Sequence, residues 1–600
     1  MIKRWLLGDP LKTAQAAHER LSKRIALAVF SSDALSSVAY ATEEILLILV
    51  LAGTAAVTWS VPISLAIVLL LIILTLSYQQ IILEYPAGGG AYIVARSNLG
   101  SWAGLTAAAA LIIDYILTVA VSTAAGIAAL TSAVPGLFPY REALCIAAIA
   151  SVMFLNLRGV RESGRIFAVP TYVFIASFIL MIGVGLAQSH NQSAVVMPAR
   201  QAVDAMSLFL ILRAFASGCT ALTGIEVISN GVSAFKAPEA KNAALTMLAM
   251  AAILAALFVG ISILAFQLGV LPKDDETVVS QIARLTFGEG FFYYLIQSAT
   301  MLILLLAANS AFAGFPRLAC ILAQDGYMPH QMACLGDRLV FSNGIIILGS
   351  LSCLLIVLFR GETHALIPLY AVGVFLSFTL SQTGMVKRWL TKQGPGWRHK
   401  FTINGIGAFA TATATVIIAS TKFTQGAWIV VLLLPLLILM FQAIHSHYIA
   451  TSEQVALTRN ARPLRPRRSL TLIPIGGVNG AVVRAVDYAR SQGGNVRAVL
   501  VDMNREETAV IETRWAQWGC GVPLVVVPAI QHSVLRTLIA YIEEHLEKDP
   551  ECWVTVVVPE ILPARWWQNL LHSQRALLLK TALLFKDRVV LTDVPFQLIR

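Results

Sequence analysis

Two short stretches of sequence decide the fold, because each interrupts a long apolar run in the same way. The first is Ser31-Ser-Asp-Ala-Leu-Ser-Ser-Val-Ala-Tyr40, and the second is Ser217-Gly-Cys-Thr-Ala-Leu-Thr-Gly-Ile-Glu226. Aligned, Asp-Ala-Leu-Ser-Ser-Val from Asp33 matches Thr-Ala-Leu-Thr-Gly-Ile from Thr220. Each stretch places hydroxyl groups and a carboxylate where a membrane helix is otherwise apolar. We interpret the pair as an internal repeat.

Long apolar runs surround these two stretches. Of the 600 residues, 57% are hydrophobic and 13% are charged, whereas charged residues make up about 25% of a typical soluble domain. The hydrocarbon core of a bilayer is about 30 Å thick and takes roughly 20 helical residues. Runs of that length predict an all-α membrane protein of about 12 transmembrane helices, near 25–54, 60–83, 100–131, 142–157, 167–187, 207–234, 240–270, 291–322, 343–359, 363–386, 401–421 and 426–446.

The matched stretches lie in the first and the sixth of these spans, so each opens a block of five. Because five is odd, the second block must cross the membrane in the opposite direction to the first. Paired interrupted helices in inverted repeats mark a binding site at the membrane midplane of secondary transporters. An interruption leaves backbone carbonyl and amide groups free, and a membrane protein tolerates this only around a ligand or water.

The net charge of +11 comes from basic residues that recur in alternate loops. This recurrence follows the positive-inside rule and predicts two cytoplasmic termini rather than a nucleic-acid partner. No cleavable signal peptide is evident in the first twenty residues, so the first span is expected to remain as a membrane helix. The chain is therefore expected to be a multi-pass protein of the cytoplasmic (inner) membrane. The basic residues are Lys3, Arg4, Lys12, Arg20, Lys23, Arg24, Arg158, Arg161, Arg165, Lys387, Arg388, Lys392, Arg398, Lys400, Arg459, Arg462, Arg465, Arg467 and Arg468.

The composition and the hydrophobic pattern of the sequence change near residue 450. Short β-branched runs there alternate with amphipathic helical stretches such as Val483–Ser491 and Val534–Leu546, which predicts a small parallel α/β sheet. The predicted domains are a cytoplasmic N-terminus (1–24), a membrane transport domain (25–448), a basic linker (449–468) and a cytoplasmic α/β domain (469–600). The expected strands are Leu470–Ile475, Val496–Val501, Leu524–Val527, Trp553–Val558 and Val589–Leu591.

Charged side chains inside the spans indicate a functional or structural role, because each raises the free energy of membrane insertion by at least about 2.5–3.5 kcal/mol at the centre of a helix. Asp33 and Glu226 lie inside the interrupted stretches, which favours a function over a structural cap or an ion pair. Asp114, Thr118 and Ser122 follow one another at intervals of four residues on one helix face, with Tyr115 beside them. For this stripe, a function is favoured over a polar seam that joins helices.

Three further charged residues lie nearer the outer ends of their spans. Glu43 and Glu44 are interpreted either as functional or as merely solvated, and the sequence leaves both readings open. Arg213 lies early in the sixth span, where its side chain can extend outward to water or contribute to an outer gate.

The chemistry of these groups indicates a cation as the ligand. Hydroxyl groups, carboxylates and backbone carbonyls replace the hydration shell of a hard monovalent cation. An amino-acid substrate requires a free helix N-terminus for its carboxylate, and Asp33 would repel that carboxylate. Burial also disfavours the charged form of a carboxyl group, so Glu226 is the candidate for taking up a proton.

Other motifs point to packing rather than to chemistry. The glycine-rich turn Tyr85–Tyr92 favours close helix approach, and the turn Pro474–Gly480 is only a weak candidate for a phosphate site. The seven cysteines have no metal-ligand spacing, and Trp566-Trp567 is interpreted as a packing or interface element rather than a ligand cage. No nucleophile–base arrangement is evident, so we expect no enzyme activity, no cofactor, and no metal other than a transported ion.

The same residues resemble a known family. Ser31–Glu43, Tyr85–Tyr92, Asp114–Ser122, Ala221–Glu226 and Ile367–Gly373 are similar to the KimA-type high-affinity potassium importers, which belong with the Kup permeases in the amino acid–polyamine–organocation superfamily. The resemblance extends over essentially the whole chain, including Arg565-Trp566 and His572–Gln574 in the tail.

This resemblance implies a LeuT-type core of two inverted five-helix repeats, two further helices and potassium uptake by K⁺/H⁺ symport. It also implies a homodimer joined through cytoplasmic domains that resemble universal stress proteins, and regulation by cyclic di-AMP. The tail shows neither a motif for that nucleotide nor the glycine signature for ATP. The residues that the resemblance assigns to potassium and proton handling are Asp33, Tyr40, Asp114, Tyr115, Thr118, Ser122, Thr223, Glu226 and Tyr370.

Two other functions stay open at this point. A proton-coupled amino-acid permease would share the superfamily's span pattern, and it would accumulate an amino acid in a way that Asp33→Asn abolishes. A membrane sensor without transport activity would show no ion flux, while its tail would bind a nucleotide.

Overall fold

The computed structural model describes residues 21–86, 88, 90–158, 164–190, 202–336, 340–456, 468–531, 533–563 and 575–598. The chain divides into two compact units, Met1–Val455 and Ala456–Arg600. We call them the membrane unit and the tail. Several sequence features lie outside the described residues: Lys3 to Arg20, Arg161, Arg459 to Arg467, Arg565-Trp566-Trp567 and His572–Gln574.

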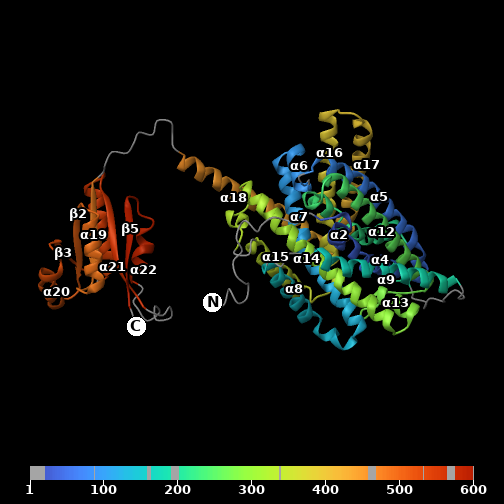
Figure 1. Cartoon of the computed structure of the whole chain (residues 1–600), viewed down its shortest axis with the longest axis horizontal. Helices are drawn as coiled ribbons and strands as arrows, with labels where there is room; N and C mark the ends of the chain where they lie inside the picture. The colour runs from blue at the N-terminus through green and yellow to red at the C-terminus, as the bar shows by residue number, and fades with distance from the viewer. Residues whose placement is uncertain are drawn as a thin grey trace. The chain divides into compact units, whose positions relative to one another are not determined.

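Within its described residues, the regular elements of the membrane unit are helices (Figure 1). Eleven helical stretches in its described ranges are long and apolar enough to cross a membrane, and a shorter apolar helix, Ser342–Leu358, accompanies them. This confirms the predicted class of about 12 spans. The helices are α2 (Lys23–Phe30), α3 (Ser32–Ser36), α4 (Val38–Leu49), α5 (Ser60–Glu84), α6 (Ala91–Leu99), α7 (Ser101–Ala133), α8 (Arg141–Leu157), α9 (Gly164–His190), α10 (Leu208–Gly218), α11 (Val227–Asn230), α12 (Glu239–Gln267), α13 (Val278–Phe287), α14 (Phe291–Gln324), α15 (Ser342–Leu358), α16 (Thr363–Lys392), α17 (Trp397–Lys422) and α18 (Ala427–Val455).

The first span is broken twice, at Ser31 and at Ser37, as the hydroxyl-rich stretch predicts. The Ser32 hydroxyl donates to the Val29 carbonyl at 3.1 Å, and the Ser37 hydroxyl donates to the Ala34 carbonyl at 2.6 Å. Serine side chains that bond to preceding carbonyls compete with the helical backbone pattern and bend or end a helix. The breaks therefore follow from the local sequence.

The sixth span is broken at the matching place. After α10 the chain forms a 3₁₀ turn at Cys219–Leu222, becomes extended at Thr223, and resumes as α11 at Val227. Gly224 has a φ of 82°, which lies in the left-handed region that favours glycine. Both members of the predicted repeat are thus interrupted helices.

Main-chain hydrogen bonds join one end of the first broken span to one end of the second. In the orientation that the sequence predicts, both ends face the cytoplasm. The Leu21 N–H donates to the Ala234 carbonyl at 2.7 Å, and the Lys236 N–H donates to the Leu21 carbonyl at 2.9 Å. These two bonds form an isolated parallel bridge between Leu21 and Phe235. We call this contact the backbone bridge.

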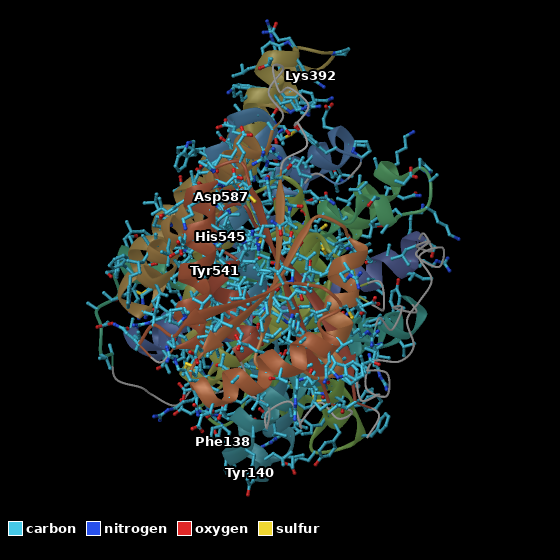
Figure 2. All side chains as sticks on the ribbon, turned by 90° about the vertical axis from the view of Figure 1, so that its left-hand side faces the viewer. Phe138, Tyr140, Lys392, Tyr541, His545 and Asp587 are labelled. Atoms are coloured by element: carbon cyan, nitrogen blue, oxygen red, sulfur yellow. The ribbon has the colours of Figure 1, made fainter. Side chains whose placement is uncertain are left out.

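The core of the membrane unit lies around α7, which is buried along most of its length. In contrast, α17 and α18 expose large apolar side chains, such as Phe409 and Leu432, as expected of lipid-facing helices. Figure 2 shows Lys392, at the end of α16, and Tyr140, in the turn before α8, at opposite ends of the membrane unit. The basic α16–α17 loop and the turn before α8 therefore lie at opposite ends of the membrane unit.

The tail is a five-stranded parallel sheet in the order β3-β2-β1-β4-β5, with helices packed on it. Apolar clusters cover both faces of the sheet, as is usual for parallel sheets. This confirms the predicted parallel α/β domain. Its elements are β1 (Ser469–Ile475), α19 (Gly480–Ser491), β2 (Asn495–Asp502), α20 (Arg505–Trp518), β3 (Leu524–Pro528), α21 (Val534–Lys548), β4 (Trp553–Leu562), α22 (Arg575–Leu583) and β5 (Val589–Gln597).

Two boundaries differ from the sequence prediction. The linker was expected from residue 449, but α18 continues to Val455, because no glycine or proline ends the helix there. The last two strands are longer than their β-branched cores indicated. Pairing in register from Val554–Val589 to Leu562–Gln597 carries both strands through proline and polar residues.

Candidate functional site

The two broken segments meet inside the membrane unit. A Cβ added to Gly224 would lie 2.8 Å from the backbone nitrogen of Ala34 and 2.8 Å from Cγ of Asp33, so only glycine permits this approach. The Ser37 hydroxyl donates to the Ala221 carbonyl at 3.1 Å, which joins the two breaks directly. The segments that the sequence pairs as a repeat are therefore in contact.

Three carboxyl groups gather at this meeting point. Asp33, Asp114 and Glu226 are all buried, with 6%, 2% and 2% of their surface exposed. The side chains of Asp114 and Glu226 interact with each other, and two carboxyl groups can share a hydrogen bond only when one of them carries a proton. One oxygen of Asp114 and one of Glu226 have no hydrogen-bond partner among the described residues. The site thus offers free oxygen atoms and a place for a proton.

Hydroxyl groups from three helices and from the break in the sixth span complete the surroundings. The Thr118 hydroxyl of α7 donates to the Tyr370 hydroxyl of α16 at 3.0 Å. The Tyr40 and Thr223 side chains interact, and Tyr40 also interacts electrostatically with Asp33 and Asp114. The Tyr115 hydroxyl accepts a hydrogen bond from Asn230 at 3.3 Å. These side chains are buried, as are nearly all residues in this part of α7.

Most of the residues singled out in the sequence come together in this one place. Through the contacts above and the electrostatic interactions among their side chains, the structure connects Asp33, Tyr40, Asp114, Tyr115, Thr118, Thr223, Glu226 and Tyr370. Ser122 is buried one helical turn beyond Thr118, and no described contact ties it to the carboxyl cluster.

Sequence reasoning missed three polar neighbours. The Ser310 hydroxyl of α14 donates to Asp33 Oδ2 at 3.3 Å, and Asn230 holds Tyr115. Tyr78 of α5 is fully buried and interacts electrostatically with Glu226 and Asp114. The sequence does mark these three residues, because each is a polar residue within or beside an apolar span. This indication of function is weak, because polar residues in membrane helices also serve ordinary helix packing.

The reading of Glu43 and Glu44 as merely solvated is wrong. Their exposed fractions are 3% and 4%, and both contact His364. Arg213 is half-buried, and its Nε has no hydrogen-bond partner among the described residues. Glu43 and Glu44 lie beyond Tyr40 along α4, toward the end of the span away from the backbone bridge.

The two glycine-rich turns have different environments. Gly88 has a φ of 108°, and a Cβ on Gly90 would lie 2.5 Å from the Asn230 side chain, so this turn packs closely against the end of α11. In the tail, the Asn479 side chain already accepts from the Val482 N–H at 3.1 Å, which caps α19 with a protein group. The second turn therefore shows helix capping rather than a prepared phosphate site.

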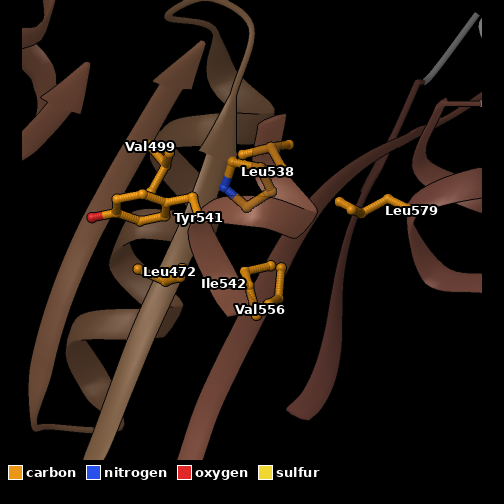
Figure 3. A pocket seen from close by; sticks show the side chains of 8 residues that line it. Leu472, Val499, Leu538, Tyr541, Ile542, Val556 and Leu579 are labelled. Atoms are coloured by element: carbon orange, nitrogen blue, oxygen red, sulfur yellow. The ribbon is translucent and has the colours of Figure 1, made fainter. Parts of the chain in front are cut away.

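A cavity in the tail also fails to suggest a nucleotide site. Figure 3 shows it between α21, α22 and the sheet. Its volume is about 10 Å³ and it is bounded by apolar groups, including Leu472, Leu538 and Val556, with Tyr541 beside them. A space of this size holds no more than about one water molecule.

Comparisons with known proteins show the family of the chain. Residues 22–443 match the amino acid permease family, and residues 467–596 match the KimA potassium transporter C-terminal domain. The potassium transporter KimA of Bacillus subtilis (strain 168) is 45% identical over 607 residues, which covers 99% of each chain. A solved manganese transporter of Eremococcus coleocola aligns with a TM-score of 0.38 at 11% identity, over 72% of this chain and 95% of the other. With two broken helices in contact, a permease-type membrane unit and a KimA-type tail, the chain belongs to the KimA family of potassium transporters within the amino acid permeases.

Proposed function

We propose that this protein takes up potassium across the cytoplasmic membrane by K⁺/H⁺ symport, through an alternating-access mechanism, with both termini in the cytoplasm. The observation that carries the proposal is the cluster of buried oxygen atoms at the contact between the two broken helices. A dehydrated potassium ion needs several oxygen ligands and a compensating negative charge. Asp33 supplies the charge, and the neighbouring hydroxyl groups supply further ligands.

The potassium-binding residues in this proposal are those that surround the carboxyl cluster. Tyr40, Thr223 and Tyr370 reach it from three different elements, so an ion held among them would couple the two repeats. On the family resemblance we assign the site to Asp33, Tyr40, Asp114, Tyr115, Thr118, Ser122, Thr223 and Tyr370.

Glu226 is the proposed proton carrier. It interacts with Asp114 inside the site and lies in the break of the second broken helix, directly before α11. Proton uptake by Glu226 in the outward-open state and release in the inward-open state would couple the proton gradient to potassium accumulation.

The experiment is potassium flux into proteoliposomes under defined potassium and pH gradients. We expect Asp33→Asn to abolish accumulation and Glu226→Gln to leave a folded protein whose uptake no longer responds to the pH gradient. Unchanged proton coupling in Glu226→Gln would remove Glu226 from the mechanism. Absence of potassium flux by well-expressed wild-type protein would contradict the proposed function itself.

An amino-acid permease is the second candidate, because the permease family matches the membrane unit. The same liposomes distinguish the two, since a permease would accumulate a labelled amino acid. The position of Asp33 argues against that substrate: it lies in the first turn of α3, where it would repel a substrate carboxylate.

Two further expectations concern the tail. We propose that it joins two chains into a homodimer and that cyclic di-AMP regulates transport through it, as the family resemblance implies. Residues 467–596 match the KimA potassium transporter C-terminal domain, which is the basis for applying the resemblance to the tail.

A further inference from the structure

A second charged cluster lies at the end of the membrane unit that the proposed orientation places outside the cell. Glu43 and Glu44 of α4 face His364 at the start of α16 and Lys422 at the end of α17. We call these four residues the outer cluster. Neither the proposed potassium site nor the proposed proton carrier includes any of them.

The contacts of the outer cluster tie four elements together. His364 Nδ1 lies 2.7 Å from Glu44 Oε1, and His364 Nε2 lies 3.5 Å from Glu43 Oε1. Lys422 Nζ lies 3.8 Å from Glu44 Oε2, and Glu43 Oε2 accepts from the Val278 N–H of α13 at 3.2 Å. The first broken helix is thereby bound to α13, α16 and α17 at one level.

The cluster stands between the surface and the potassium site. A cavity of about 30 Å³ is lined by Tyr40 on its inner side and by Glu43 and His364, together with threonine hydroxyls and small residues of α7. The His364 side chain is 45% exposed, whereas Glu43 and Lys422 are buried. An ion that moves from the surface to Tyr40 by way of this cavity has to pass the outer cluster.

The two contacts of His364 depend on its protonation. A neutral imidazole has one N–H donor, whereas an imidazolium has two. Here each ring nitrogen faces a different carboxylate oxygen. With only one proton on the ring, a nitrogen lone pair would face one of the carboxylates, and that contact would be repulsive.

The other charges around His364 do not substitute for its second proton. Lys422 faces Glu44 only, and its neighbour Arg213 of α10 is a like charge that weakens this pair. Glu362, two residues before His364, is paired with Arg141 of α8. The described residues of α7 and α14 that line the cavity, and Thr277 directly before α13, are uncharged.

We propose that the outer cluster is the extracellular gate of the transport path, and that the doubly protonated His364 holds it closed. Loss of one proton from His364 releases α4 from α16 and opens the cavity toward the outside. The inference goes beyond the proposed proton carrier, and it rests on the proposed orientation of the chain.

The test measures access to the cavity from outside. Ala128 lines the cavity on α7, so an Ala128→Cys variant reports access of a membrane-impermeant thiol reagent applied to intact cells without potassium. Thr58→Cys, at an exposed position in the predicted outer loop, corrects for the effect of pH on thiol reactivity. The chain without an added cysteine gives the background from the native cysteines.

Labelling of Ala128→Cys relative to Thr58→Cys is expected to rise between about pH 7 and about pH 10, because the two facing carboxylates stabilise the imidazolium and let His364 lose a proton only at alkaline pH. A rise on the order of tenfold corresponds to the loss of one charge-assisted hydrogen bond. Adding His364→Gln should give rapid labelling at both pH values, and adding His364→Arg, which keeps two donors and a fixed charge, should give slow labelling at both.

The outcomes separate the gate from the proposal on which it rests. If Thr58→Cys is not labelled from outside, the proposed orientation fails. If Thr58→Cys is labelled but the relative rate at Ala128→Cys is the same at both pH values, or is unaltered by His364→Gln, the outer cluster is not a protonation-controlled gate.

Discussion

At the scale of single residues, the contact between the two broken helices depends on one missing side chain. Gly224 has a positive φ, and a methyl group there would meet Asp33 and the Ala34 backbone. The carboxylate that we propose as a potassium ligand is therefore positioned by a residue that contributes no ligand itself.

We expect Gly224→Ala to abolish potassium uptake while the protein still reaches the membrane. The methyl group would push the two breaks apart and add backbone strain, which costs roughly 1–2 kcal/mol for a residue in the left-handed region. Uptake in a bacterial strain deficient in potassium transport measures this. Gly183→Ala is the matched control, because a Cβ at Gly183 of α9 meets nothing within 4 Å. Normal uptake by Gly224→Ala would show that the close approach is dispensable.

Single residues also show what sequence can and cannot reveal about the site. Asp33, Asp114 and Glu226 could be found because a buried charge in a membrane span is costly and demands a reason. Ser310 could not, since its bond to Asp33 joins residues 277 positions apart. His364 and Lys422 lie at span ends, where a charge ordinarily meets water, so nothing in their local sequence indicated Glu43 and Glu44 as partners. The functional roles of these site residues remain predictions.

At the scale of secondary-structure elements, α16 and α17 pack at a close contact. Gln382 of α16 is fully buried, and both its amide atoms lack a partner among the described residues. A Cβ on Gly407 of α17 would lie 1.6 Å from the Gln382 side-chain oxygen. The glycine thus makes the space into which the amide fits.

Replacing Gly407 with alanine should destabilise the membrane unit by about 1–3 kcal/mol, the usual cost of adding a methyl group to a filled interior. The midpoint of heat denaturation in detergent should fall accordingly. Gly405→Ala lies on the same helix, meets nothing within 4 Å, and should leave the midpoint unchanged. Equal midpoints for the two variants would contradict the packing described for Gln382.

Elements were predictable where a local cause fixes them. The breaks in the first span follow from serine hydroxyls that bond to carbonyls three residues earlier, and the strands follow from β-branched runs. The end of β4 was not predictable, because Pro559 and Glu560 are extended by pairing with β5 rather than by their own preference.

At the scale of the whole molecule, the chain consists of two units with separate apolar cores. The tail buries apolar side chains on both faces of its sheet, which is sufficient for independent folding of a parallel α/β domain. Its stability should therefore not depend on the membrane unit.

Residues 467–600 expressed alone should give a soluble protein that unfolds cooperatively, as followed by circular dichroism. Val556→Asp, which places a charge in the core of β4, should abolish the transition. Light scattering should give twice the chain mass if the tail joins two chains. A cooperative but monomeric tail would refute the proposed dimer contact and leave the fold unaffected.

The backbone bridge has a consequence for experiments that search for gating residues. Its two hydrogen bonds run between main-chain atoms of Leu21, Ala234 and Lys236, so exchanging any of these side chains for alanine leaves both bonds in place. An alanine scan would therefore find no effect on transport in this region. It would do so even if the backbone bridge makes the inner halves of both broken spans move together. Only removal of an amide hydrogen, as in Lys236→Pro, or an amide-to-ester replacement at that position would expose the connection.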